Sequence, residues 1–110
     1  MWVRENLEGL PEELAAVTTA VWSVPEHFRI GVMRSVMLAP PYVWAMPLGG
    51  GYTKLKKLPG LMDDFQEMLG LRIIFAEADQ AASRNQALIR WAGFTEIRRV
   101  NSRIVYQRSI

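Results

Sequence analysis

Three consecutive glycines after Pro47 mark a candidate ligand-binding loop. Glycines let the backbone approach a bound phosphate closely, and a helix that follows such a loop offers free N–H groups to an anion. The pattern predicts a phosphate-binding loop over residues 49–53, and the alternative is an ordinary turn after the proline. The predicted binding residues are Gly49, Gly50, Gly51, Tyr52 and Thr53.

Two side chains are candidates for proton transfer. Tyr106 is a phenol in the last predicted strand, and Glu77 follows the most apolar predicted strand, at a sheet end where substrates often bind. We therefore predict a catalytic acid at Tyr106 and a general base at Glu77. The alternatives are a half-buried packing residue for Tyr106 and a surface or capping carboxylate for Glu77.

The composition excludes several kinds of metal and nucleophile site and is typical of a globular protein. The chain has 110 residues, no cysteine and one histidine, His27, which excludes a Cys-ligated zinc site, a thiol nucleophile and a His-rich metal site. With 50% hydrophobic and 22% charged residues, it is expected to form one globular domain over residues 1–110. No apolar run is long enough to span a membrane, and the N-terminus does not resemble a signal peptide.

Positive charge is concentrated near the C-terminus, although the net charge is only +2. Residues 84–110 hold six arginines and one acid, Glu96. Such a segment could bind nucleic acid, the phosphates of a cofactor or an acidic protein, and the alternative is a solvated strand face. The arginines are Arg84, Arg90, Arg98, Arg99, Arg103 and Arg108.

The first half of the chain is expected to contain one helix and three short strands. Pro11 and the carboxylates after it predict a helix over residues 11–23, with Trp22 on its inward face. Period-two alternation favours a strand over residues 28–38, where a helix is the alternative. The other two predicted strands cover residues 2–5 and 42–46.

The second half is expected to hold the core of the fold. An apolar stripe that includes Met68 predicts a helix over residues 61–69, which Pro59 either begins or kinks and Gly70 ends. The near-continuous apolar run 71–76 predicts a strand covered on both faces, at the centre of a sheet.

Two more elements complete this half. A helix is predicted over residues 80–92, and a hairpin turning at Asn101-Ser102 comes after it. The order of elements predicts an α/β or α+β fold, a mixed sheet with helices packed on it. The residues expected on the inward face of helix 80–92 are Ala81, Leu88, Trp91 and Ala92.

Residues 42–110 resemble the second half of the GNAT family of N-acetyltransferases. The resemblance rests on the glycine loop that begins at Met46, and on a strand, a helix, Gly93-Phe94 and a hairpin in the family's order. It implies acetyl-coenzyme A bound by backbone N–H groups of residues 49–53, with Lys54, Lys56 and Lys57 adding charge, and acetyl transfer to an amine.

The sequence departs from the GNAT pattern at three polar positions. Ile89 occupies the position of the tyrosine that usually serves as the family's general acid. Ala82 occupies the position of an asparagine, and Met46 that of a polar residue in the loop. These changes favour a non-catalytic member retained for its shape.

The same segment resembles, more distantly, the internal virion proteins of podophages. That resemblance implies a structural protein of a virion or assembly, found in the virion or the host cytoplasm. The basic last strands and the aromatic residues beside Pro40 and Pro41 predict protein contacts through the hairpin 97–108 or the corner Pro40–Trp44. The alternatives are an acetyl-coenzyme A-dependent acyltransferase and a small nucleic-acid-binding or regulatory module.

Overall fold

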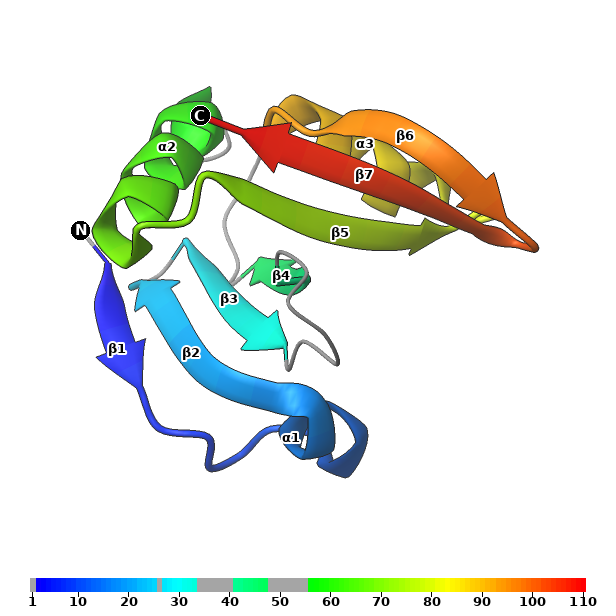
Figure 1. Cartoon of the computed structure of the whole chain (residues 1–110). Coiled ribbons are helices and arrows are strands. Elements are labelled where there is room, and N and C mark those ends of the chain that lie inside the picture. The colour runs from blue at the N-terminus through cyan, green and yellow to red at the C-terminus, as the bar shows by residue number, and fades with distance from the viewer. Residues whose placement is uncertain (1, 26, 34–40, 48–55) are drawn as a thin grey trace. The chain divides into compact units, whose positions relative to one another are not determined.

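The computed structural model describes residues 2–25, 27–33, 41–47 and 56–110. The chain divides into two compact units, Met1–Leu55 and Lys56–Ile110, each with its own sheet. Figure 1 shows the elements of both units. The prediction of a single domain over the whole chain stays a prediction.

The first unit is an antiparallel sheet with strand order β1-β2-β3-β4. Its core is formed by apolar side chains of β2, β3 and β4, among them Val21 and Ile30, both 1% exposed. A short helix, α1, precedes β2 (Figure 1). The elements are β1 (Val3–Glu5), α1 (Glu12–Val17), β2 (Thr18–Val24), β3 (Phe28–Met33) and β4 (Val43–Pro47).

The predicted helix over residues 11–23 is wrong in its second half. It ends at Val17, and the next seven residues form strand β2, which pairs with both β1 and β3. Thr18, Thr19 and Val21 are β-branched and favour a strand. Pairing with two neighbours thus outweighs the helical spacing, and Trp22 lies on the sheet with the Arg4 guanidinium 5.6 Å from its ring.

The predicted strands at 28–38 and 42–46 are confirmed by β3 and β4, while residues 34–38 lie outside the described part. One glycine is required where these strands pair. The Trp44 ring lies across Gly31, so a Cβ at that position would overlap the indole. The Trp44 Nε1 donates a hydrogen bond to the Thr18 hydroxyl at 2.9 Å, which fixes the ring against β2.

The second unit is an antiparallel three-stranded sheet with order β5-β7-β6, and α3 lies against β5. The α+β class is thereby confirmed. The strands form two antiparallel sheets instead of the single mixed sheet predicted. In this one β7 lies in the centre, since it pairs with both β5 and β6, whereas the strand predicted to be central, β5, lies at an edge (Figure 1). The elements are α2 (Leu58–Leu69), β5 (Ile73–Asp79), α3 (Ser83–Trp91), β6 (Thr95–Val100) and β7 (Arg103–Ser109).

Of the two alternatives predicted for helix α2, the structure shows the one in which Pro59 begins the helix. Pro59 lies in its first turn, where its missing N–H costs nothing, and Gly70 ends it with φ +67°. Met62 and Phe65 are buried as expected. Met68 is 44% exposed, however, and Gln66 is fully buried in its place.

Strand β5 starts two residues later than predicted and continues to Asp79. Ile74, Ala76 and Ala78 are buried, whereas Glu77 and Asp79 on the opposite face are exposed. Within the predicted bounds, Ile74 and Ala76 are buried on one face, and Ile73 and Phe75 on the other face are half-buried. Beyond Ala76 the pleat turns the carboxylates of Glu77 and Asp79 away from the core.

The inward face predicted for helix 80–92 is partly wrong. The helix begins only at Ser83, because the Asp79 carboxylate accepts the Ala81 N–H at 2.8 Å and holds residues 80–82 in a turn. Ala92 is buried and Leu88 is half-buried, but Ala81 is exposed and Trp91 is 52% exposed. Within the helix, the half-buried residues are Gln86, Leu88 and Ile89.

Candidate functional site

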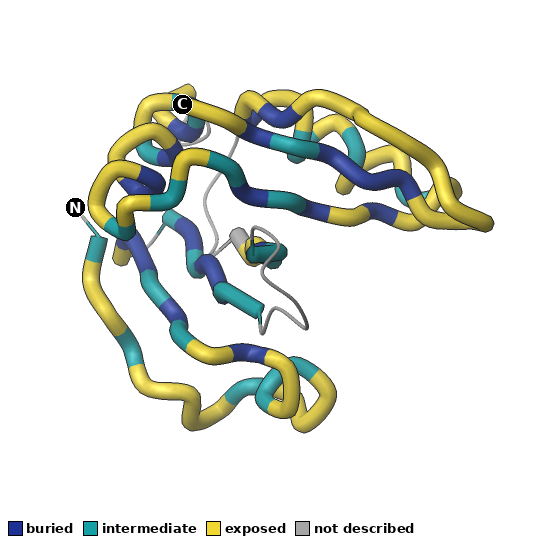
Figure 2. The backbone as a smooth tube through the Cα atoms, viewed as in Figure 1, coloured by how far each residue is buried: buried dark blue, intermediate teal, exposed yellow. Residues whose placement is uncertain are grey.

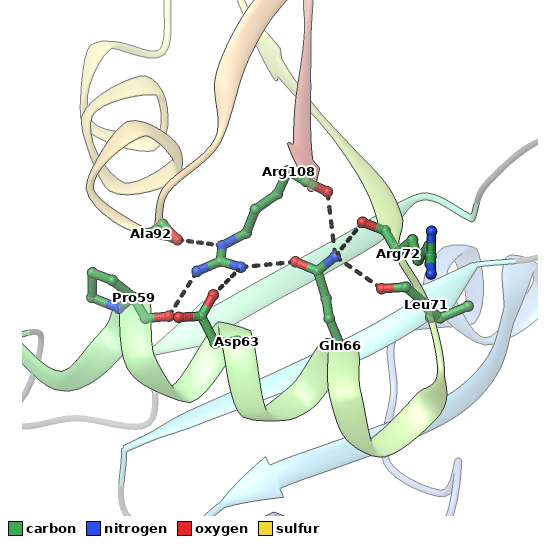
Figure 3. A network of polar contacts seen from close by, with 7 residues as sticks. All are labelled: Pro59, Asp63, Gln66, Leu71, Arg72, Ala92 and Arg108. Carbon is green, nitrogen blue, oxygen red and sulfur yellow. Dashed lines mark hydrogen bonds and ion pairs between the residues drawn. The ribbon is translucent and has the colours of Figure 1, made fainter. Parts of the chain in front are cut away.

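A network of polar contacts centred on Arg108 joins the elements of the second unit (Figure 3). Arg108 is 5% exposed, and its Nε donates to the carbonyl oxygen of Ala92 at 2.8 Å. Its two terminal nitrogens donate to the Pro59 carbonyl oxygen at 2.7 Å and to the Gln66 Oε1 at 2.9 Å. An ion pair to Asp63 at 2.9 Å completes the coordination of the guanidinium.

Gln66 carries the network on to the strands. Its Nε2 lies within 3.0–3.3 Å of three carbonyl oxygens, those of Leu71, Arg72 and Arg108. Gly93 borders the cluster at φ +100°, where a Cβ would lie 3.0 Å from the Arg108 Nε. These contacts connect α2 to the start of β5, to β7 and to the end of α3.

The Arg108 network changes the expectation of a basic C-terminal face. The Arg108 guanidinium is buried and fully used within the fold, so it is not available to a phosphate. Two further arginines make exposed ion pairs, Arg99 with Glu96 at 3.0 Å and Arg103 with Glu77 at 3.5 Å. The exposed arginines of this segment with no ion pair in the described structure are Arg84, Arg90 and Arg98.

Tyr106, the predicted acid, lies in the core of the second unit. It is 0% exposed, so it is buried more deeply than the half-buried alternative supposed. Ala76 of β5 and Glu96 of β6 lie opposite it on the neighbouring strands. Its hydroxyl has no hydrogen-bond partner in the described part of the chain.

Glu77, the predicted base, lies on the other face of the same sheet. It pairs in register with Val105, whereas Tyr106 pairs with Ala76. Successive residues of a strand point to opposite faces, so the structure does not bring the Glu77 and Tyr106 side chains together. The Glu77 carboxylate is exposed and is paired with Arg103.

The predicted phosphate loop, Gly49 to Thr53, lies outside the described residues. Two predicted charge-bearing residues nearby are described. Lys56 and Lys57 are exposed immediately before α2, whose first turn has no side-chain cap. At two other positions of the resemblance, Ile89 is half-buried, and Ala82 is the N-cap residue of α3 with no hydrogen bond from its side chain.

The described residues contain no group of three or more His, Asp or Glu side chains arranged to hold a metal ion. The His27 side chain makes a local hydrogen bond, with its Nδ1 3.0 Å from the Pro25 carbonyl oxygen. In the same part of the chain, no helix is long and apolar enough to cross a membrane.

Sequence reasoning missed Gln66 and the internal role of Arg108. Gln66 sits beside Phe65 on a helix whose apolar stripe was predicted largely correctly, but nothing near it in sequence indicates burial. Its acceptors include the Arg108 carbonyl oxygen, 42 residues away along the chain. Only the folded arrangement brings these groups together.

No protein-family model and no curated protein matches the sequence. Solved structures do match. The Campylobacter jejuni N-acetyltransferase PseH, in complex with acetyl-coenzyme A, has a TM-score of 0.64 at 10% identity, with 99% of each chain covered. A putative GNAT-family acetyltransferase from Bordetella pertussis has a TM-score of 0.60 at 14% identity, with 92% of this chain and 79% of that chain covered.

Other matches are to longer proteins. An acetyltransferase from Agrobacterium tumefaciens has a TM-score of 0.58 at 15% identity, and the match covers 83% of this chain but only 60% of that one. The match to the ribosomal-protein-S5-alanine acetyltransferase from Vibrio fischeri covers 54% of that protein's length. At these identities the likeness concerns the fold alone, and it identifies the architecture of this chain as that of the GNAT acetyltransferases.

Proposed function

We propose that this protein is a GNAT-fold protein that binds acetyl-coenzyme A. The observation that carries the proposal is the match to PseH in its acetyl-coenzyme A complex, which extends over 99% of both chains. A fold alone does not specify a ligand, so the proposal also needs a suitable site in this sequence.

The residues around α2 fit an anionic ligand. The glycines of the predicted loop shortly precede a helix whose first-turn N–H groups have no side-chain cap, and Lys56 and Lys57 lie exposed beside them. The backbone of residues 49–53 would hold the pyrophosphate, with the positive end of the helix dipole and the two lysines compensating its charge.

We further propose that the protein uses this fold for binding and assembly rather than for acetyl transfer. The thiolate that leaves in acetyl transfer gains from a positioned proton donor. Ile89 offers no proton at the position suggested by the resemblance, and the Tyr106 hydroxyl is enclosed in the core. The absence of a positioned proton donor is consistent with a structural role in a virion or another assembly. The contacts would be made through the hairpin 97–108 or the Pro40–Trp44 corner.

The second candidate is an acetyl-coenzyme A-dependent N-acetyltransferase. It is favoured by one specific observation, that the solved structures named above are acetyltransferases. In that case a bound water or Glu77 would have to accept the proton of the amine, and the acceptor would enter from the exposed face of β5.

Binding is tested by thermal unfolding with increasing acetyl-coenzyme A. A ligand that binds only the folded state stabilises it by about 2.7 kcal/mol at one hundred times its Kd. We expect a concentration-dependent rise in Tm that is lost in Gly49→Val and Gly51→Val, because a side chain there blocks the approach of the pyrophosphate. Met68→Ala is the control, since Met68 is 44% exposed and lies at the opposite end of α2 from the proposed site.

Transfer is tested in the same samples by measuring release of the coenzyme A thiol in the presence of a panel of amines. We expect no release above the rate without protein. Amine-dependent turnover would establish the second candidate, and its loss in Glu77→Gln would assign the base to Glu77. A folded protein whose Tm does not change with acetyl-coenzyme A would refute the first candidate.

A further inference from the structure

Strand β6 has an open edge. In the order β5-β7-β6 it pairs on one side with β7, and none of the described strands pairs with its other side. All six of its residues, Thr95–Val100, are exposed, as the yellow course of the tube in Figure 2 shows. The backbone N–H and C=O groups of such an edge are a template for another strand.

A β-bulge gives this edge an unusual distribution of charge. Glu96 pairs with Tyr106 and Arg98 with Val105, so Ile97 is an extra residue on β6. In a regular strand, residues three apart point to opposite faces. The extra residue instead puts Glu96 and Arg99 on one face, where their side chains form an ion pair at 3.0 Å.

We propose that the β6 edge pairs with the β6 edge of a second copy of this chain. The strands run antiparallel about a twofold axis that passes between Ile97 and Arg98, perpendicular to the sheet. In this register Glu96 lies opposite Arg99 of the second copy, and Arg99 lies opposite its Glu96. The two sheets then continue as one across the axis.

The bulge makes this register possible. Two residues directly opposite each other in an antiparallel pair have their side chains on the same face of the sheet. Their N–H and C=O groups point either both toward the partner strand or both away from it. Residues three apart would fail both conditions in a regular strand. Because Glu96 and Arg99 face positions two apart on β7, Tyr106 and Ile104, they satisfy both.

A second copy suits this edge better than an acidic segment of another protein. An all-acidic strand would place a carboxylate opposite Glu96, whereas the strand's own sequence provides one acid and one base at symmetric positions. Association would also shield the exposed apolar side chains of Ile97 and Val100, which are 44% and 50% exposed. Charges and bulges on edge strands can alternatively keep sheets apart, in which case the protein would remain monomeric.

The test is sedimentation velocity from micromolar to millimolar protein, with Glu96→Arg, Arg99→Glu and the double exchange. A twofold interface contains every residue twice, so each single variant places two pairs of like charges opposite each other. We expect a wild-type dimer, association weakened about tenfold or more in each single variant, and recovery in the double variant. Circular dichroism at each concentration verifies that the variants are folded.

The matched controls are Glu77→Arg and Arg103→Glu, which break another exposed ion pair of this sheet between β5 and β7. These controls should associate like the wild type. Slower amide hydrogen exchange along β6 at high protein concentration would further support the interface. A monomer at every concentration overturns the proposal, and so does a dimer that the single variants leave unchanged or a folded double variant that does not recover.

Discussion

At the residue scale, two buried hydroxyl groups have opposite surroundings. The Thr18 hydroxyl donates to the Leu14 carbonyl oxygen at 2.6 Å and accepts a hydrogen bond from Trp44. The Tyr106 hydroxyl has no partner among the described residues, although its residue is fully buried. A buried polar group without a hydrogen bond costs about 1–3 kcal/mol, so the two groups should affect stability in opposite directions.

Replacing Tyr106 with phenylalanine should leave the free energy of unfolding unchanged or raise it by about 1 kcal/mol, because the ring stays packed and an unsatisfied group is removed. Thr18→Val, the control, should lower it by about 1 kcal/mol through the loss of two hydrogen bonds. Urea unfolding measures both. A loss above about 1 kcal/mol in Tyr106→Phe would contradict this and point to a bound water or ligand at the hydroxyl.

At the scale of elements, the Arg108 network holds α2 to the sheet of the second unit. Arg108 extends from β7 to the first turn of α2 and to the end of α3, and Gln66 extends from α2 to the start of β5 (Figure 3). The network thus joins segments that are far apart in the sequence. It therefore fixes the position of α2, whose N-terminus belongs to the proposed binding site.

Removing the guanidinium in Arg108→Met should lower the free energy of unfolding by about 3–5 kcal/mol, because buried carbonyl groups and the Gln66 amide lose their donor. Asp63→Asn should cost about 1 kcal/mol or less, since Asp63 is largely exposed and asparagine still offers an oxygen. The comparison is made by urea unfolding. Equal losses in the two variants would mean that the ion pair, and not the buried hydrogen bonds, carries the stabilisation.

At the scale of the whole molecule, the pH dependence of stability reports on the first sheet. The Glu5 carboxylate connects β1 to its neighbours. A hydrogen bond from Ser23 lowers its pKa below the ordinary value of 4.5, partial burial opposes this, and Arg29 lowers it further. Two nitrogens of Arg29 lie 3.2 and 3.4 Å from the two carboxylate oxygens.

Because the folded pKa is the lower one, the unfolded chain binds the proton more tightly. The stabilisation is fully present above pH 4.5 and is lost as the pH falls through the folded pKa. Glu5→Gln should therefore be less stable than the wild type at neutral pH, by no more than about 1 kcal/mol, and equally stable in acid. Urea unfolding at several pH values checks this, and a difference that grows toward low pH would contradict it.

Elements whose signals are local could be predicted from the amino-acid sequence. Pro59 and Gly70 set the ends of α2, alternation defined β3, and the Asn101-Ser102 turn defined the hairpin, because each depends on the geometry of a few neighbouring residues. The GNAT-like order of elements in the second half came from the same signals, and the fold agrees with it.

Features that depend on partners far away in the sequence could be seen only in the folded chain. Residues 18–24 became a strand because β1 and β3 pair with them, against their helical spacing. Arg108, which was expected on a basic surface, lies in the core because α2 and the end of α3 supply its hydrogen-bond acceptors. The candidate pair Tyr106 and Glu77 was separated for a comparable reason: strand register assigns each residue to one face of the sheet, and register is fixed only when strands pair.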